Sequence, residues 1–290
     1  MIFEIEPRQQ NLAVKCILLA IVVFGASFAA TASTHKHIRT HQQRSEPAPM
    51  RIFIAGDSTA QIYGPDRYPQ MSWGMVLQCG FGGDVTVFDY AKGGRSTKSF
   101  IDEGRLDALA KDLAKGDTLL IAFGHNDEAS EIPARFTDPE SDFRDYLRKY
   151  VDAARAKGAE PVLLTPVTRH SFEDGKLVDT HAIYARAIRA VAAETKTPLV
   201  DLDAVSMAWL ENIGPEASKS DYLYTAVSDR YWRFPDGSTD DTHFSEMGSR
   251  GIANLIVGEL AKLKLPISMR VKAIRPGLTR PVPLGSPACQ

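Results

Sequence analysis

Four short segments of this 290-residue chain contain the residue types that serine-dependent ester hydrolysis needs. In chain order they are Gly56-Asp57-Ser58-Thr59, Gly93-Gly94-Arg95-Ser96, Gly124-His125-Asn126-Asp127 and Asp240-Asp241-Thr242-His243. The first has a hydroxyl nucleophile, and the last has a histidine base with a carboxylate three residues upstream. The middle two have a backbone N–H and a side-chain amide that can stabilise an oxyanion. Together they predict an acyl-transfer site.

Ser58 follows a glycine at the end of a predicted strand, where a tight turn would expose its hydroxyl. A serine hydroxyl needs an adjacent base to take its proton, and His243 is the best candidate. On a tight loop or helical turn, the three-residue spacing brings the Asp240 carboxylate to Nδ1 of His243. The predicted oxyanion donors are the N–H groups of Ser58 and Gly94 and the side-chain amide of Asn126, because each follows a different strand.

Each segment taken alone is more simply explained as an ordinary turn or a helix cap. Their order, their positions after strands and their complementary chemistry together favour the catalytic interpretation. The sequence lacks the G-x-S-x-G elbow, a phosphate-binding G-x-x-x-x-G-K-[ST] loop and zinc-binding spacings of His and Cys, so no metal or cofactor is expected. The net charge of −2 gives no basis for nucleic-acid binding. His181 lies in a helical pattern and is expected at the surface.

The N-terminus has the composition of a secretory signal peptide. Arg8 and Lys15 precede an apolar run, Cys16–Ala30, which leads into Ala30-Thr31-Ala32. The run has 15 residues, whereas a membrane-spanning helix needs about 20. A cleaved signal over residues 1–32 is therefore favoured over an uncleaved anchor. It predicts a secreted or periplasmic protein without stable membrane association after cleavage, and polar residues 33–49 are expected to be a flexible spacer.

Short apolar runs alternate with helical periodicity from residue 50 to residue 265. The predicted strands are Met50–Ala55, Asp84–Phe88, Thr118–Phe123, Pro161–Leu164 and Pro198–Asp201. The predicted helices are Trp73–Gln78, Arg105–Ala114, Asp142–Lys157, His181–Thr195 and Glu246–Leu263, the last capped by Ser245. This alternation predicts a flavodoxin-like α/β domain, a three-layer α/β/α sandwich around a parallel sheet of about five strands.

Three features fall outside that pattern. The aromatic-rich stretch 214–240 is expected either to shape a substrate groove or to cover the core. Residues 266–290 are basic and rich in proline, and are expected to form a loosely ordered tail. Cys79 and Cys289 would remain after signal cleavage. They can pair in an oxidising compartment, but Cys79 is more simply interpreted as a small buried residue.

The set Asp57-Ser58, Gly94, Asn126 and Asp240-x-x-His243 resembles the four sequence blocks of the SGNH (GDSL-type) hydrolases over nearly all of the predicted domain. Within that superfamily, residues 56–60, 94–100, 123–127 and 165–169, with Trp73-Gly74, are similar to rhamnogalacturonan acetylesterases. The resemblance implies that Ser58 is the nucleophile of a triad with Asp240 and His243. It also implies an oxyanion hole formed by Ser58 N–H, Gly94 N–H and Asn126.

The sequence therefore predicts a serine esterase that removes O-acetyl groups from rhamnogalacturonan or its oligosaccharides. Arg95, Arg169 and Arg233 are candidates for binding galacturonate carboxylates, and Trp232 for covering a sugar face. The chain is expected to act as a monomer on an acetylated poly- or oligosaccharide. The alternatives are an esterase for another acetylated glycan such as xylan or for a short-chain ester, and a catalytically silent glycan-binding protein.

Overall fold

The computed structural model describes residues 49–290. The predicted signal peptide, 1–32, and residues 33–48 of the predicted spacer lie outside the described residues, so both stay predictions. Between residues 49 and 290, no helix combines the length and the apolar character that crossing a bilayer requires.

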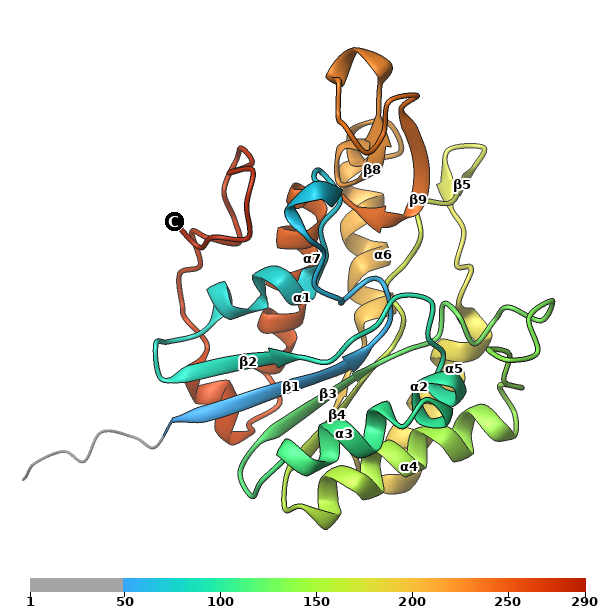
Figure 1. Ribbon diagram of the computed structural model, residues 1–290, viewed down its shortest axis with the longest axis vertical. Coiled ribbons are helices and arrows are strands. Elements are labelled where there is room, and N and C mark those ends of the chain that lie inside the picture. The colour runs from blue at the N-terminus through green and yellow to red at the C-terminus, as the bar shows by residue number, and fades with distance from the viewer. Residues whose placement is uncertain (1–48) are drawn as a thin grey trace, which may run out of the picture. The chain divides into compact units, whose positions relative to one another are not determined.

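A parallel sheet of five strands lies at the centre of the domain (Figure 1). Its strands are β1 (Met50–Gly56), β2 (Val85–Asp89), β3 (Thr118–Ala122), β4 (Glu160–Leu164) and β7 (Leu199–Val200), and they are arranged in the order β2-β1-β3-β4-β7. The order reverses around β1, because the chain moves first to β2 on one side and then to β3 on the other. In open α/β sheets, ligands bind at the carboxyl ends of strands at such a reversal.

Continuous apolar runs form these strands because both faces of the sheet are covered. Along β1, Ile52 and Ile54 point into one core, and Phe53 and Ala55 point into the other. Helices α1, α6 and α7 pack on the first face, whereas α2, α3, α4 and α5 cover the second (Figure 1). The predicted three-layer α/β/α architecture is confirmed.

The helices mostly follow the predicted periodicity. Their bounds are α1 (Trp73–Val76), α2 (Thr97–Asp102), α3 (Arg105–Asp112), α4 (Asp142–Ala156), α5 (Ala182–Thr195), α6 (Leu202–Ile213) and α7 (Glu246–Leu260). Short 3₁₀ helices are η1 (Pro65–Arg67), η2 (Leu77–Gly80), η3 (Ala217–Ser220), η4 (Val227–Asp229) and η5 (Pro266–Arg270). The Ser245 side chain accepts a hydrogen bond from Gly248 N, which confirms it as the cap of α7. Helices α2 and α6 were not predicted; α6 begins two residues after the short strand β7, within one apolar stretch.

Two antiparallel hairpins extend beyond the sheet. One is short and consists of β5 (Phe172–Glu173) and β6 (Lys176–Leu177). The other pairs β8 (Tyr222–Thr225) with β9 (Ser238–Phe244), and it contains most of the aromatic-rich stretch 214–240 (Figure 1). Strand β9 holds Asp240 and His243, so this hairpin positions the predicted base.

The C-terminal stretch 266–290 is packed, so the prediction of a loosely ordered tail is wrong. Ile267 and Leu278 are buried in the core. The buried guanidinium of Arg250 donates to the carbonyl oxygens of three tail residues, Gly277, Ser286 and Ala288. Its ion-pair partner, Glu246, accepts hydrogen bonds from Leu284 N and Gly285 N, each at 2.7 Å. This buried pair on α7 therefore organises the tail by satisfying its backbone groups.

Cys79 and Cys289 form a disulfide, contrary to the favoured interpretation of Cys79 as a free buried residue. Their Cα atoms lie 5.2 Å apart, although 210 residues separate them in sequence. The bond ties the packed tail to η2, which follows α1. Sequence spacing alone does not show such an approach, because it depends on how the tail docks on α7.

Candidate active site

The turn after β1 presents Ser58 at the carboxyl edge of the sheet. Ser58 is partly exposed, whereas its neighbours Asp57 and Thr59 are buried. Oδ1 of Asp57 accepts hydrogen bonds from Thr59 N at 2.9 Å and Thr59 Oγ1 at 2.8 Å. The Tyr63 hydroxyl donates to the Ser58 carbonyl oxygen at 2.8 Å. These bonds fix the backbone on both sides of Ser58 and leave its hydroxyl free of a role in the turn.

Asp240 and His243 form a hydrogen-bonded pair on β9. Oδ2 of Asp240 lies 2.7 Å from Nδ1 of His243, and Oδ1 accepts from the backbone N–H groups of Thr242 and His243 at 2.9 Å each. Burial alone would raise the pKa of Asp240, but these hydrogen bonds and the nearby imidazole lower it to about 2. The carboxylate therefore fixes the imidazole with Nε2 available for proton transfer.

An irregularity in β9 explains how residues three apart meet. In a regular strand, side chains at i and i+3 point to opposite faces. On β8, Tyr222 pairs with Phe244 and the next residue, Leu223, pairs with Asp240. Residues 241–243 therefore bulge out of the ladder, which folds the strand back on itself. The sequence predicted a tight loop or helical turn; the structure provides a bulged strand.

Residues 71–73 connect the nucleophile turn to the base strand. Met71 N donates to the carbonyl oxygen of Phe244, which directly follows His243, at 3.0 Å. Trp73 N donates to the carbonyl oxygen of Thr59, which directly follows Ser58, at 3.2 Å. The segment thus fixes the backbones beside the two predicted catalytic residues at one edge of the sheet. Within residues 49–290, no hydrogen bond joins the Ser58 side chain to His243.

Gly94 and Asn126 follow β2 and β3, on either side of β1. Gly94 has a φ of +77°, a conformation that favours glycine and turns its backbone away from the regular path. The Asn126 amide donates to the carbonyl oxygen of Arg95 at 3.2 Å. An amide nitrogen carries two protons, so a second remains for an oxyanion.

Asp127 joins the loop of Gly94 to the loop of Asn126. The buried carboxylate accepts hydrogen bonds from Thr97 N, Thr97 Oγ1 and Thr137 Oγ1. Burial raises the pKa of Asp127 to about 7, although the Thr97 and Thr137 hydrogen bonds oppose the shift. Thr97 begins α2, so Asp127 fixes the loop of Gly94 relative to the loop of Asn126.

Residues 54–250 match the model of the GDSL-like lipase/acylhydrolase family. The chain belongs to this family. It is accordingly a carboxylic ester hydrolase. It is 41% identical over 220 residues to rhamnogalacturonan acetylesterase RhgT of Bacillus subtilis, covering 76% of this chain and 93% of RhgT. It is 36% identical over 217 residues to the probable rhamnogalacturonan acetylesterase YesY of the same organism, covering 75% of this chain and 95% of YesY.

The GDSL-like fold is also found in a crystal structure of the Bacillus subtilis protein YxiM. The two structures match with a TM-score of 0.64 and 27% sequence identity, over 76% of this chain and 58% of YxiM.

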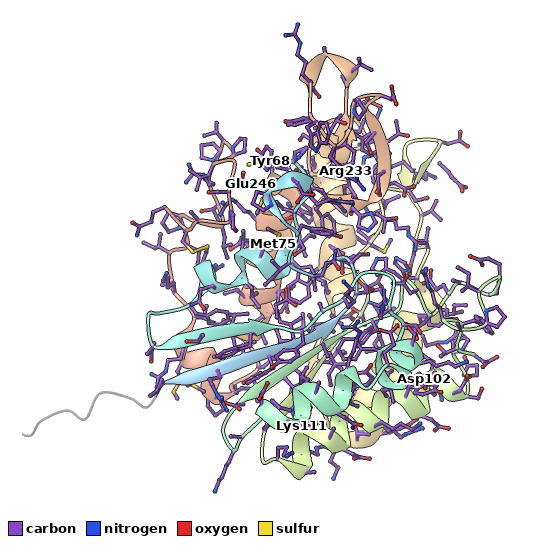
Figure 2. The ribbon with its side chains drawn as sticks, viewed as in Figure 1. Tyr68, Met75, Asp102, Lys111, Arg233 and Glu246 are labelled. Carbon is purple, nitrogen blue, oxygen red and sulfur yellow. A yellow bond between two sulfur atoms is a disulfide. The ribbon has the colours of Figure 1, made fainter. Side chains whose placement is uncertain are left out.

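The four predicted substrate-binding residues of this GDSL-like hydrolase have different surroundings. Arg95 pairs with Glu103 at 3.0 Å and donates to the carbonyl oxygen of Gly93. Trp232 is 84% exposed and Arg233 is also exposed, both on the β8–β9 hairpin, where Figure 2 labels Arg233. Arg169 instead contacts two protein side chains, Thr242 and Glu128.

Glu128 and His181 are polar residues near the site that the sequence did not reveal. His181 is fully buried, contrary to its predicted surface position, and its Nδ1 makes a short contact with Glu128 Oε1. Burial lowers the pKa of His181 well below its usual value, so the imidazole is neutral. Burial raises the pKa of Glu128 to about 7, opposed by the charges of His125 and Arg169. Glu128 directly follows the Asn126-Asp127 pair, and this position is the one available sequence signal.

The described part of the chain offers no metal site. From residue 49 to residue 290, His, Cys, Asp and Glu side chains nowhere gather in a group of three or more that could hold an ion. Two cavities include residues that hydrogen-bond to or pair with the backbone of the candidate site, Tyr63 and Met71 in one and Leu223 in the other. One of about 220 Å³ is bounded by Tyr63, Met71, Met75 and tail residues 285–287. The other, of about 290 Å³, lies along the β8–β9 hairpin and includes Tyr68 and Glu246, which Figure 2 labels close together.

Proposed function

We propose that this hydrolase is a serine esterase that removes O-acetyl groups from rhamnogalacturonan or its oligosaccharides. The catalytic part of this proposal rests on one observation, the hydrogen-bonded Asp240–His243 pair, which segment 71–73 links to the Ser58 turn. The substrate part is supported by the similarity to RhgT, which extends over 93% of that acetylesterase. The predicted signal peptide supports action as a secreted or periplasmic protein, and we propose that it acts as a monomer.

In the first half-reaction, His243 Nε2 takes the proton from Ser58 Oγ as the oxygen attacks the acetyl carbonyl. The tetrahedral oxyanion is stabilised by the N–H groups of Ser58 and Gly94 and by the free amide proton of Asn126. The imidazolium is stabilised by Asp240, which stays ionised because its pKa is about 2. His243 then gives the proton to the sugar oxygen, and the sugar leaves with its hydroxyl restored.

In the second half-reaction, a water molecule replaces the sugar. His243 takes a proton from the water as its oxygen attacks the acetyl-Ser58 carbonyl. The same donors stabilise the second oxyanion, and its collapse releases acetate and returns the proton to Ser58 Oγ. All proton transfers pass through one imidazole, so the mechanism uses only side chains and backbone groups of this chain.

The surface beside the pair has features that suit a sugar chain. The cavity of about 290 Å³ along the hairpin is lined by the partly exposed Tyr68, Tyr224 and Tyr231, and by Ser245 and Glu246, which follow His243 in the sequence. Aromatic faces pack against the apolar faces of sugar rings. The exposed Arg233 supplies a guanidinium group for a galacturonate carboxylate. Arg95 supplies a second one when it exchanges Glu103 for the substrate carboxylate.

Acetate release from a matched set of polymers tests the proposal. Acetylated rhamnogalacturonan, acetylxylan and acetylated homogalacturonan are incubated in parallel with wild type and with Ser58→Ala. We expect the highest kcat/KM on rhamnogalacturonan and a loss on the order of 10⁴–10⁶-fold in the variant. Faster release from acetylxylan would reject the substrate assignment, and undiminished hydrolysis by Ser58→Ala would reject the nucleophile. Glycan binding without any acetate release would favour a silent binding protein.

A further inference from the structure

A chain of polar and aromatic contacts runs from the nucleophile turn to the base strand. Nδ1 of His125 lies 3.4 Å from Asp57 Oδ2, and the His125 ring packs edge-on against His181, with centroids 4.4 Å apart. His181 contacts Glu128, whose other oxygen lies 3.5 Å from Arg169 Nη1. Arg169 Nε donates to Thr242 Oγ1 at 3.2 Å. We call Asp57, His125, His181, Glu128, Arg169 and Thr242 the bridging network.

Both ends of the bridging network adjoin predicted catalytic residues. Asp57 directly precedes Ser58, and Thr242 directly precedes His243 in the bulge of β9. The backbone strengthens the second end, because His170 N donates to the carbonyl oxygen of Asp241 at 2.8 Å. The stretch after β4 therefore holds the bulge through one main-chain bond and one side-chain bond.

The surroundings of Arg169 favour a structural partner over a substrate carboxylate. Its side chain is 26% exposed, and that of Glu128 is 17% exposed. Glu128 Oε2 already accepts from Nη1, and Thr242 accepts from Nε, so two edges of the guanidinium are occupied by the protein. Loss of Arg169 would leave Oε2 of the partly buried Glu128 without its hydrogen-bond donor, and unpaired buried polar groups are costly.

We propose that Arg169 is a positioning residue: with Glu128 behind it, it holds the Asp240–His243 bulge through Thr242 so that the imidazole faces Ser58. This inference rests on the proposed serine-esterase function and replaces the expected role of Arg169 in binding galacturonate. Bulged residues lack ladder hydrogen bonds, so side-chain contacts must fix them. Displacement of a catalytic group by about 1 Å can reduce the rate about 100-fold.

The test compares Arg169→Met, Arg169→Lys and Thr242→Val on a neutral ester, 4-nitrophenyl acetate, and on acetylated rhamnogalacturonan. Thr242→Val is nearly isosteric and removes the acceptor for Arg169 together with the exposed hydrogen bond to Asp241 Oδ1, which Asp241→Asn tests separately. We expect Arg169→Met and Thr242→Val each to lower kcat about 10- to 100-fold on both substrates, with KM changed less than about twofold. The double variant Arg169→Met/Thr242→Val should have a kcat no lower than that of the poorer single variant, because both substitutions break the same Arg169–Thr242 contact. Arg169→Lys should recover part of kcat.

Arg186→Met is the matched control, because Arg186 is an exposed arginine of α5 that, among residues 49–290, pairs only with Glu140, itself exposed. Its kcat and KM on both substrates should equal those of wild type. A KM increase confined to the uronate-containing polymer, with unchanged hydrolysis of the neutral ester, would show instead that Arg169 binds substrate. Unchanged kcat in Thr242→Val would also overturn the proposal.

Amide hydrogen exchange provides a readout that does not depend on esterase activity. In Arg169→Met and Thr242→Val, residues 238–244 should exchange faster, while the strands of the central sheet keep wild-type protection. If wild type releases no acetate yet these variants loosen residues 238–244, the proposed function fails and the positioning contact stands. If wild type is active and protection of residues 238–244 is unchanged in both variants, the positioning role fails and the proposed function stands.

Discussion

Nδ1 of His243 lies 2.7 Å from Oδ2 of Asp240 because residues 241–243 bulge out of strand β9. The same carboxylate fixes the bulge, since its other oxygen accepts from the amides of Thr242 and His243. One side chain thus has two tasks, which are to shape the loop and to orient the imidazole. Substitutions that separate these tasks are informative.

Asp240→Asn keeps Oδ1 as an acceptor for both loop amides but replaces the charge at Oδ2. We expect kcat to fall roughly 10³- to 10⁴-fold, because a neutral amide neither fixes the tautomer nor stabilises the imidazolium. The melting temperature should stay close to that of wild type. Asp241→Asn is the matched control. In the described part of the chain, the exposed Asp241 carboxylate accepts only from Thr242 Oγ1, so this variant should remain active. Equal losses in both variants would contradict the assigned role.

Asn126→Ala removes one of the three proposed oxyanion donors. The expected loss in kcat is roughly 10²- to 10³-fold, with KM little changed, since the donor acts mainly on charge that develops in the transition state. Steady-state kinetics on 4-nitrophenyl acetate measure both parameters. A loss of less than about tenfold would mean that the Asn126 amide serves chiefly to hold the Arg95 carbonyl.

Cys289→Ser removes the only disulfide in the described residues, 49–290. We expect the free energy of unfolding to fall by about 2–5 kcal/mol, because the bond closes a long loop in the unfolded chain. Chemical denaturation with and without a reductant measures the effect. Reductant should destabilise wild type to the level of the variant and leave the variant unchanged. A variant as stable as the oxidised wild type would contradict the prediction.

Asp89 at the end of β2 should make stability depend on pH. Its Oδ1 accepts from Ala91 N, whereas its Oδ2 is buried without a partner, and burial raises the pKa to about 8. Between the unfolded value of 3.8 and about 8, the folded chain keeps a proton that the unfolded chain has lost. Stability contributed by this group is therefore greatest at low pH, and it falls as pH rises towards 8.

The amide side chain in Asp89→Asn cannot ionise. This variant should therefore lose the part of the decline in stability with rising pH that Asp89 causes. The difference in free energy of unfolding between variant and wild type should shift in favour of the variant from pH 4 to pH 8. Denaturant titrations at several pH values measure it. Asp107→Asn, on the exposed side of α3, is the control and should give a constant difference. A constant difference for Asp89→Asn would show that the carboxyl is ionised in the folded protein.

The sheet could be predicted from the sequence because its strands are buried on both faces. Runs such as Ile52–Ala55 and Leu119–Phe123 are apolar throughout, and each is followed by glycine and polar residues at the edge where the site lies. Catalytic residue types at strand ends were therefore visible without coordinates. The bulge could not be predicted, because it depends on how β9 pairs with β8, and the register of that pairing gives no signal in the local sequence.

The bridging network and the packed tail could not be predicted, for a related reason. His181 and Glu128 are 53 residues apart, and each looks like an ordinary polar residue in its own segment. Glu246 and Arg250 have the i,i+4 spacing of a surface ion pair, yet both are buried because tail backbone groups surround them. Burial of polar residues follows from long-range packing, which composition and periodicity do not report.

The Cys79–Cys289 bond encloses most of the described chain in one covalent ring. A protease that cuts a single peptide bond anywhere between these two cysteines produces two fragments that remain attached to each other. Such nicked molecules would run on a denaturing gel as one species without reductant and separate into two with it. A chain built this way keeps Ser58 and His243 on the same covalent unit after one such cut.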